Sequence, residues 1–179
     1  KKEWELREKS QKDCLTGLLN NSTIKQQIGA RLQSLKRGQT GYLVVQDVDS
    51  FKKINDTNGH LFGDAVLCSF ADELSNIFPE ALKGRIGGDE FVFYVEDMDR
   101  EQLEEKLKQL NRCMSDRYDD DKTGLHISCS LGAAVTDGTV TDYNMLFQWA
   151  DAALYQVKSK GKGACQGRCG IARQELSGQ

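Results

Sequence analysis

The strongest constraint on the fold is the way the spacing of apolar residues changes along this 179-residue chain. Apolar positions three or four residues apart predict helices, and short runs rich in β-branched and aromatic residues predict strands. These patterns predict, in chain order, a helix at 22–37, a strand at 41–48, a helical turn at 51–55, a helix at 64–78, strands at 82–86 and 91–95, a helix at 99–118, a strand at 126–136 and a helix at 143–159. The sequence therefore indicates one α+β domain.

The order strand, helix, strand, strand, helix, strand is typical of the split βαβ arrangement, which is ferredoxin-like. We expect an antiparallel sheet with flanking helices on one face. The first two strands should run parallel, with the third antiparallel between them. This topology places Asp47, at the end of the first strand, at the same sheet edge as the Gly87-Gly88 turn.

Four acidic residues are predicted to converge at that edge: Asp47, Asp49, Asp89 and Glu90. Carboxylates gathered at one end of a sheet repel one another unless a hard cation such as Mg²⁺ or Mn²⁺ lies between them. The two glycines before Asp89 would let backbone amides approach a phosphate closely. The alternative for each acidic residue is a solvated surface position, and for the glycines a tight turn alone.

The balance of 24 basic and 27 acidic residues gives a net charge of −3, which provides no field for gripping nucleic acid or an anionic membrane. We therefore expect no nucleic-acid partner and no membrane contact by this fragment. The longest stretch without a charged residue, 123–136, is shorter than the roughly 20 residues of a spanning helix. Six cysteines without an export signal favour reduced thiols and a cytoplasmic location.

Both ends of the chain are expected to lie outside the domain. Residues 1–12 are highly charged, contain only Trp4 and Leu6 as apolar residues, and begin at Lys1 instead of Met. Such a segment is too polar to form a stable helix alone, so we expect the end of a connecting helix from a longer protein. The domain itself is expected at 13–163, and the glycine-rich residues 164–179 are expected to be a mobile tail.

Several motifs resemble one known family in order and spacing. The stretch 85–91, RIGGDEF, resembles the signature of the GGDEF family of diguanylate cyclases. Further matches are DCLTGLLN at 13–20, DVDSFKKIND at 47–56, NGHLFGD at 58–64 and ADAALYQVK at 150–158. The resemblance spans residues 13 to about 163 and implies a fold of the nucleotidyl-cyclase and polymerase-palm type.

The resemblance implies that two GTP molecules condense to cyclic di-GMP with release of two pyrophosphates. Each of two domains would hold one GTP, so the expected partners are GTP, a second copy of the domain in a transient dimer, and an upstream sensory domain. Asp47, the backbone carbonyl of Val48, Asp89 and Glu90 are expected to hold Mg²⁺ or Mn²⁺. Asp89, with Glu90 beside it, is also expected at the position of the proton acceptor for the 3′-hydroxyl.

The resemblance also implies the residues that bind the substrate. Asn55 and Asp64, with His60 nearby, are expected at the guanine base. The triphosphate is expected at the backbone of Gly87 and Gly88 and at three lysines, Lys52, Lys158 and Lys162. Without the motifs, Asn55 would be interpreted as a turn residue, Asp64 as a helix cap, His60 as a loop residue and the lysines as solvated side chains.

Two departures from the family pattern bear on function. Lys162 and Gly163 replace the family's frequent Arg and Asn, so a bidentate contact becomes a point-charge contact. Phe78 and Ala81 occupy the places of an R-x-x-D product-inhibition motif.

Two other functions remain open at this point. A degenerate domain could bind GTP or cyclic di-GMP without turnover, although the retained carboxylates and glycines favour catalysis. A different nucleotidyl cyclase or polymerase palm would share the metal site, but Asn55 and Asp64 argue against adenine.

Overall fold

The computed structural model describes residues 11–160 and 168–172. Ten elements follow one another in this part of the chain: α2 (Asn21–Ser34), β1 (Gly41–Val48), α3 (Phe51–Asn58), α4 (His60–Ile77), β2 (Leu82–Gly87), β3 (Glu90–Glu96), α5 (Arg100–Tyr118), β4 (Cys129–Thr136), α6 (Tyr143–Ser159) and β5 (Arg168–Ala172). None of the helices in the described ranges is long and apolar enough to cross a membrane.

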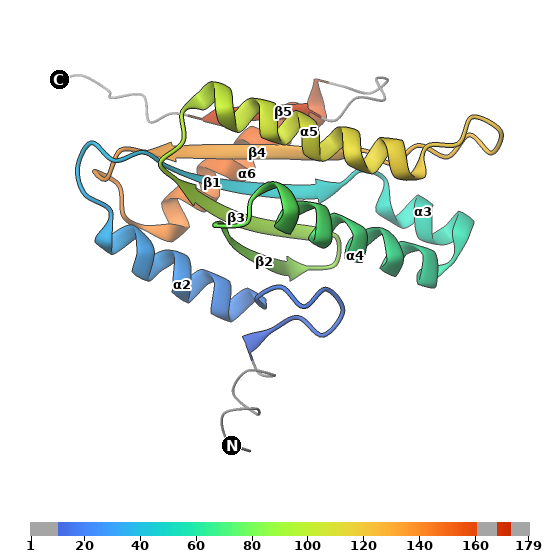
Figure 1. Ribbon diagram of the computed structural model, residues 1–179, viewed down its shortest axis with the longest axis horizontal. Coiled ribbons are helices and arrows are strands. Elements are labelled where there is room, and N and C mark those ends of the chain that lie inside the picture. The colour runs from blue at the N-terminus through green and yellow to red at the C-terminus, as the bar shows by residue number, and fades with distance from the viewer. Residues whose placement is uncertain (1–10, 161–167, 173–179) are drawn as a thin grey trace, which may run out of the picture.

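The sheet has the strand order β2-β3-β1-β4-β5 (Figure 1). The first three pairings are antiparallel, and β3 lies between β1 and β2, as the split βαβ arrangement predicts. The α+β fold is thereby confirmed. The fifth strand was not predicted: residues 168–172, which were expected within a mobile tail, pair parallel with β4. The open edge of β4 offers unpaired backbone groups, and this short segment satisfies them.

Helices cover both faces of the sheet, so the prediction of helices on one face was wrong. Successive residues of β1 point to opposite faces, with Val44 in a core that includes α4 and α5, and Val45 in a core that includes α2 and α6. Figure 1 shows α4 and α5 in front of the strands and α6 behind them. The continuous apolar run of β1 requires this double covering, since both of its faces are buried.

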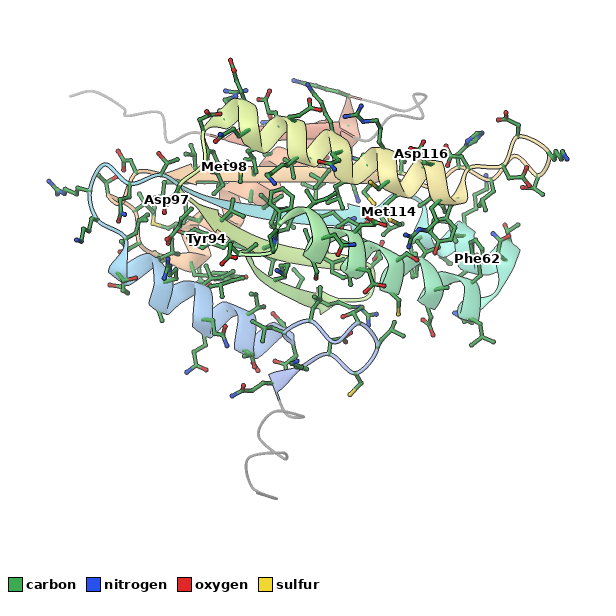
Figure 2. All side chains as sticks on the ribbon, in the orientation of Figure 1. Phe62, Tyr94, Asp97, Met98, Met114 and Asp116 are labelled. Carbon is green, nitrogen blue, oxygen red and sulfur yellow. The ribbon has the colours of Figure 1, made fainter. Side chains whose placement is uncertain are left out.

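The helix α5 shows how the predicted amphipathic pattern is used. Its predicted start is confirmed, because the Asp99 carboxylate accepts a hydrogen bond from the backbone N–H of Gln102 at 2.8 Å and completes a capping box. The helix turns the buried Met114 toward the strands and the exposed Asp116 away from them (Figure 2). The apolar residues Leu103, Leu107, Leu110 and Met114, three or four positions apart, are all buried and form the inward face of this helix.

Several element boundaries differ from those predicted. Asn20 caps α2, because its side-chain oxygen accepts a hydrogen bond from the N–H of Thr23 at 3.1 Å, and the helix runs from Asn21 to Ser34 and not over 22–37. The strand β4 begins three residues later than expected. The helix α4 begins at His60, so Asp64 lies inside the helix and does not cap it. Gly59, with φ of 88°, makes this early start possible by reversing the chain between α3 and α4.

Candidate active site

The end of β1 and the turn between β2 and β3 form the centre of the site. Asp47 is directly opposite Glu90 in the antiparallel register, and the Val48 N–H lies 3.4 Å from the carbonyl oxygen of Asp89. The predicted meeting of Asp47 with the glycine turn is therefore confirmed. In Figure 1 the β1 arrow ends on the side of the molecule where α3 begins.

Burial and neighbouring negative charge raise the pKa values of Asp47 and Glu90 at this edge. Burial and then the neighbouring carboxyl of Asp89 raise the pKa of Asp47 to about 6, although Lys158 opposes the rise. Burial, followed by the negative charge of Asp47, also raises the pKa of Glu90. Negative charge is thus concentrated in a partly desolvated place, where a cation is favoured.

Asp49 does not join this group, contrary to the prediction. Its two carboxylate oxygens accept hydrogen bonds of 2.6 Å from the hydroxyls of Ser128 and Ser130, and its N–H donates to the Ser128 carbonyl at 2.9 Å. These contacts engage both oxygens of Asp49 and connect the end of β1 to the start of β4.

Among the described residues, no three acidic, histidine or cysteine side chains lie close enough together to hold a metal ion by themselves. Mg²⁺ is usually bound by one or two carboxylates together with substrate phosphates, and it seldom has an all-protein cage. Asp47 and the neighbouring Asp89, whose carboxyl helps to raise the pKa of Asp47, supply hard oxygen ligands of that kind. The residues therefore fit a metal that is bound jointly with a nucleotide.

Lys158, in the last turn of α6, forms an ion pair with Asp47. Its ammonium donates to the Asp47 Oδ2 atom, and the two side chains are 38% and 17% exposed. Sequence reasoning placed this lysine on the triphosphate and did not anticipate its contact with a candidate metal ligand.

The glycine turn leaves room above its backbone. A Cβ atom built at Gly87 or Gly88 would have no atom within 4 Å, and Gly88 has a positive φ of 43°. Its backbone is therefore accessible to a ligand. Lys52 is exposed on α3, whereas Lys162 lies outside the described residues.

The candidate base-binding residues lie where α3 meets α4. The Asn55 Oδ1 atom is buried and has no hydrogen-bond partner in the described part of the chain. A Cβ atom at Gly63 would lie 1.8 Å from it, so any larger residue there would displace the Asn55 side chain. Asp64 follows immediately and is half-buried, while His60 is exposed one turn earlier. Asp64 makes no side-chain hydrogen bond or ion pair with the described residues.

Sequence reasoning missed the support behind the glycine turn. The Arg85 guanidinium donates to the Gly88 carbonyl at 2.8 Å and to both carboxylate oxygens of Asp13 at 3.2 Å. Burial raises the pKa of Asp13, but hydrogen bonds from Thr16 and Arg85 outweigh it and hold that pKa below its usual value. Both residues stood within motifs, yet nothing in their separation along the chain predicts this contact.

Backbone hydrogen bonds also connect the opening turn at 13–19 to β2. The Arg85 N–H donates to the Leu19 carbonyl at 2.9 Å, and the Leu19 N–H donates to the Lys83 carbonyl at 3.1 Å. Leu19 also forms a parallel bridge with Gly84. The opening turn at 13–19 is thus attached to β2, close to the glycine turn.

The antiparallel strands β2-β3-β1-β4 and their covering helices form a palm-like α+β fold, with Asp47 beside an open glycine turn. The sequence profile of the diguanylate cyclase GGDEF domain matches residues 10–164. The chain belongs to this GGDEF domain family.

Named relatives and a solved structure agree with this assignment. The chain is 31% identical over 156 residues to the probable diguanylate cyclase DgcT of Escherichia coli K12, covering 84% of this chain and 34% of DgcT. It is 35% identical over 154 residues to the diguanylate cyclase DgcS of Shewanella oneidensis, covering 84% of this chain and 50% of DgcS. The chain therefore spans only a third to a half of the length of these relatives.

The fold resembles a crystal structure of the coiled coil and GGDEF domain of DgcB from Caulobacter crescentus in complex with cyclic di-GMP. The TM-score is 0.81 at 27% identity, and the match covers 96% of this chain and 90% of the solved chain.

Proposed function

We propose that this domain is a diguanylate cyclase, which condenses two GTP molecules to cyclic di-GMP. In each of two steps a 3′-hydroxyl oxygen attacks an α-phosphate, a phosphodiester bond forms, and pyrophosphate leaves while the hydroxyl proton passes to a base. The observation that carries this proposal is the juxtaposition of Asp47, Asp89 and Glu90 with the open glycine turn. It combines a cation site with backbone groups for phosphate, which phosphoryl transfer requires.

The metal-holding residues in this proposal are Asp47 and Asp89, with the Val48 carbonyl and Glu90 beside them. Cyclases of this family generally depend on divalent metals, and a bound Mg²⁺ or Mn²⁺ would polarise the α-phosphate and activate the attacking oxygen. Asp89 lies in the turn, next to the space where a substrate would enter, and serves as the candidate acceptor of the hydroxyl proton. Glu90 adds negative charge beside Asp47 and Asp89, and this charge favours the binding of a cation there.

Guanine is proposed to bind between Asn55 and Asp64. A carboxylate accepts hydrogen bonds from the N1–H and the exocyclic amine of guanine, a donor pair that adenine lacks. The buried and unpartnered Oδ1 atom of Asn55 supports this proposal, because a buried polar atom without a partner is costly until a ligand satisfies it. His60 is exposed at the rim and is proposed to contact the base from outside.

The triphosphate is proposed to lie over the backbone of Gly87 and Gly88. Lys52 and Lys158 would supply positive charge to it, and Lys162 would add a further point charge. The free space above the glycines supports the position of the phosphates.

A second copy of the domain is required by the chemistry, because each domain has one candidate site and the product joins two nucleotides. GGDEF domains act on GTP and work as dimers. We further propose that an upstream sensory domain brings the two copies together, and that any membrane attachment of the complete protein lies outside this fragment.

The decisive experiment is incubation of the purified protein with GTP and either Mg²⁺ or Mn²⁺, followed by identification of the products by mass. Cyclic di-GMP with two equivalents of pyrophosphate is the expected result. GTP binding without any product would instead assign the domain to the binding-only class. The Asp89→Asn variant is the matched control, since it keeps the shape of the side chain and removes its charge.

A further inference from the structure

Lys158 and Asp47 form an ion pair, although the proposed function assigns them to different ligands, the triphosphate and the metal. Asp47 is a proposed metal ligand, yet its Oδ2 atom accepts a hydrogen bond from the Lys158 ammonium. The lysine comes from the last turn of α6 and the aspartate from the end of β1. Among the described residues, Asp47 is the only side chain with which Lys158 forms an ion pair or hydrogen bond.

A cation at Asp47 is incompatible with this contact. A divalent metal bound to the carboxylate would repel an ammonium group that stays on the same oxygen, and the lysine would lose the only ion pair that it forms among the described residues. Both groups are partly desolvated, so breaking the pair without replacement is costly. The triphosphate of GTP is an anion that could receive the displaced lysine.

We propose that Lys158 is an exchangeable counter-ion: it neutralises Asp47 in the empty site and moves to the triphosphate when nucleotide and metal enter together. This inference rests on the proposed function, because it takes Asp47 as a metal ligand and a nucleoside triphosphate as the ligand.

The exchange couples metal binding to nucleotide binding. Metal alone must break the ion pair between Lys158 and Asp47 without replacing it, so the affinity of the site for metal alone is reduced. With nucleotide present the lysine has a new partner and the penalty disappears. By thermodynamic linkage, the metal must then strengthen nucleotide binding by the same factor. The exchange thereby disfavours a metal ion in the site before its substrate arrives.

The test measures the affinity of the protein for Mn²⁺ in the absence of nucleotide. Electron paramagnetic resonance detects the bound and free ion. Lys158→Met removes the ammonium group that pairs with Asp47. Lys52→Met is the matched control, because it removes the same charge from an exposed lysine that has no ion pair among the described residues. Asp47→Asn identifies the site and should abolish this binding. A cooperative thermal unfolding transition in each variant shows that its fold is retained.

Lys158→Met is expected to bind Mn²⁺ alone about three- to tenfold more tightly than the wild type, a range set by one partly buried ion pair. The same variant should bind a GTP analogue with a methylene bridge between the α- and β-phosphates more weakly in the presence of Mn²⁺. Lys52→Met should also bind the GTP analogue more weakly, but its affinity for Mn²⁺ alone should equal that of the wild type. Opposite changes in the two affinities are the signature of exchange.

Unchanged or weaker Mn²⁺ binding by Lys158→Met, or an equal gain in Lys52→Met, would overturn the inference. Absence of Mn²⁺ binding to every variant would overturn it too, together with the metal assignment. Because the Mn²⁺ measurement uses no nucleotide and no turnover, a protein that makes no cyclic di-GMP would refute the proposed function and still give a clear result here.

Discussion

The Ser130 hydroxyl on β4 donates a hydrogen bond of 2.6 Å to the Asp49 carboxylate just beyond β1. Ser130 is buried, so little solvent is available to replace it. The contact fixes the point where the chain leaves β1 for α3, the helix that carries Asn55.

We expect Ser130→Ala to lower the free energy of unfolding by about 1.5–3 kcal/mol, the usual range for a hydrogen bond to a charged group. Urea unfolding measures this directly. Ser34→Ala is the control, because Ser34 is exposed and bonds only a neutral carbonyl; its effect should stay within about 0.5 kcal/mol. Equal effects of the two changes would show that the Asp49 contact does not hold this junction.

Asp89→Asn should abolish turnover while preserving the fold. The side chain belongs to a repulsive carboxylate group, so neutralising it removes a metal ligand and relieves repulsion. Loss of a supporting partner alone weakens a metal site about 10- to 100-fold, so loss of a ligand should reduce turnover by more than about 100-fold. Steady-state rates with saturating GTP, together with thermal unfolding, measure both effects. Activity close to that of the wild type would refute the metal assignment.

The stability of the metal-free protein should depend on pH through Asp47. Its pKa is raised from an ordinary 3.8 to about 6, so the folded state binds this proton more tightly than the unfolded state. The resulting stabilisation is complete below the unfolded pKa and is lost as the pH rises through about 6.

Asp47→Asn cannot ionise and should escape this loss. Relative to the wild type, its free energy of unfolding should therefore increase between about pH 4 and pH 7. Urea unfolding in chelator at several pH values tests this, with the exposed Asp151→Asn as control. If the difference in free energy of unfolding between the variant and the wild type stays constant across this pH range, the raised pKa of Asp47 would be contradicted.

Asp64→Ala should weaken the use of GTP far more than it weakens the fold. A site built to accept substrate N–H groups loses about 10- to 100-fold in kcat/KM when a charged acceptor is removed. Asp72→Ala, on the same helix and outside the proposed site, is the control. The unmutated protein should also prefer GTP strongly over ATP, and equal turnover of the two nucleotides would exclude this role for Asp64.

Cyclic di-GMP should not bind at the family's product-inhibition position. Phe78 is 2% exposed and packs against Phe93 with ring centroids 5.0 Å apart, and Ala81 is buried as well. Neither side chain can form a charge-assisted hydrogen bond with the product. The Lys83 ammonium is already engaged by the carbonyls of Phe78 and Pro79.

Calorimetric titration of cyclic di-GMP into protein whose active site is filled with the methylene-bridged GTP analogue should therefore detect no binding. A tight second site that disappears on mutation of Lys83 would show that the lysine has replaced the missing arginine.

The sequence predicted the meeting of Asp47 with the glycine turn because sheet topology alone determines it. Once β3 lies antiparallel between β1 and β2, the end of β1 must face that turn. The hydrogen bonds of the Asp49 carboxylate could not be predicted in this way. They depend on the hydroxyls of Ser128 and Ser130, which lie on a different strand and the loop before it. Topology thus predicts which residues are neighbours, while side-chain partners decide which of them are available.

The covering of both sheet faces could have been anticipated from β1. Its eight residues include no outward polar face, with apolar Val44 and Val45 on opposite sides. The pairing of 168–172 was harder to foresee, since a five-residue segment rich in small residues has little strand preference of its own. Its pairing is determined by the free edge of β4.

The Arg85 side chain joins two parts of the domain that are far apart in the sequence. It connects the Asp13 carboxylate, near the start of the described residues, to the carbonyl of Gly88 in the glycine turn. The backbone hydrogen bonds of Leu19 with Lys83 and Arg85 form a second connection to the same strand. We therefore expect a displacement of the chain just before Asp13 to be transmitted to the glycine turn through β2 and the Arg85 guanidinium, without rearrangement of the hydrophobic core.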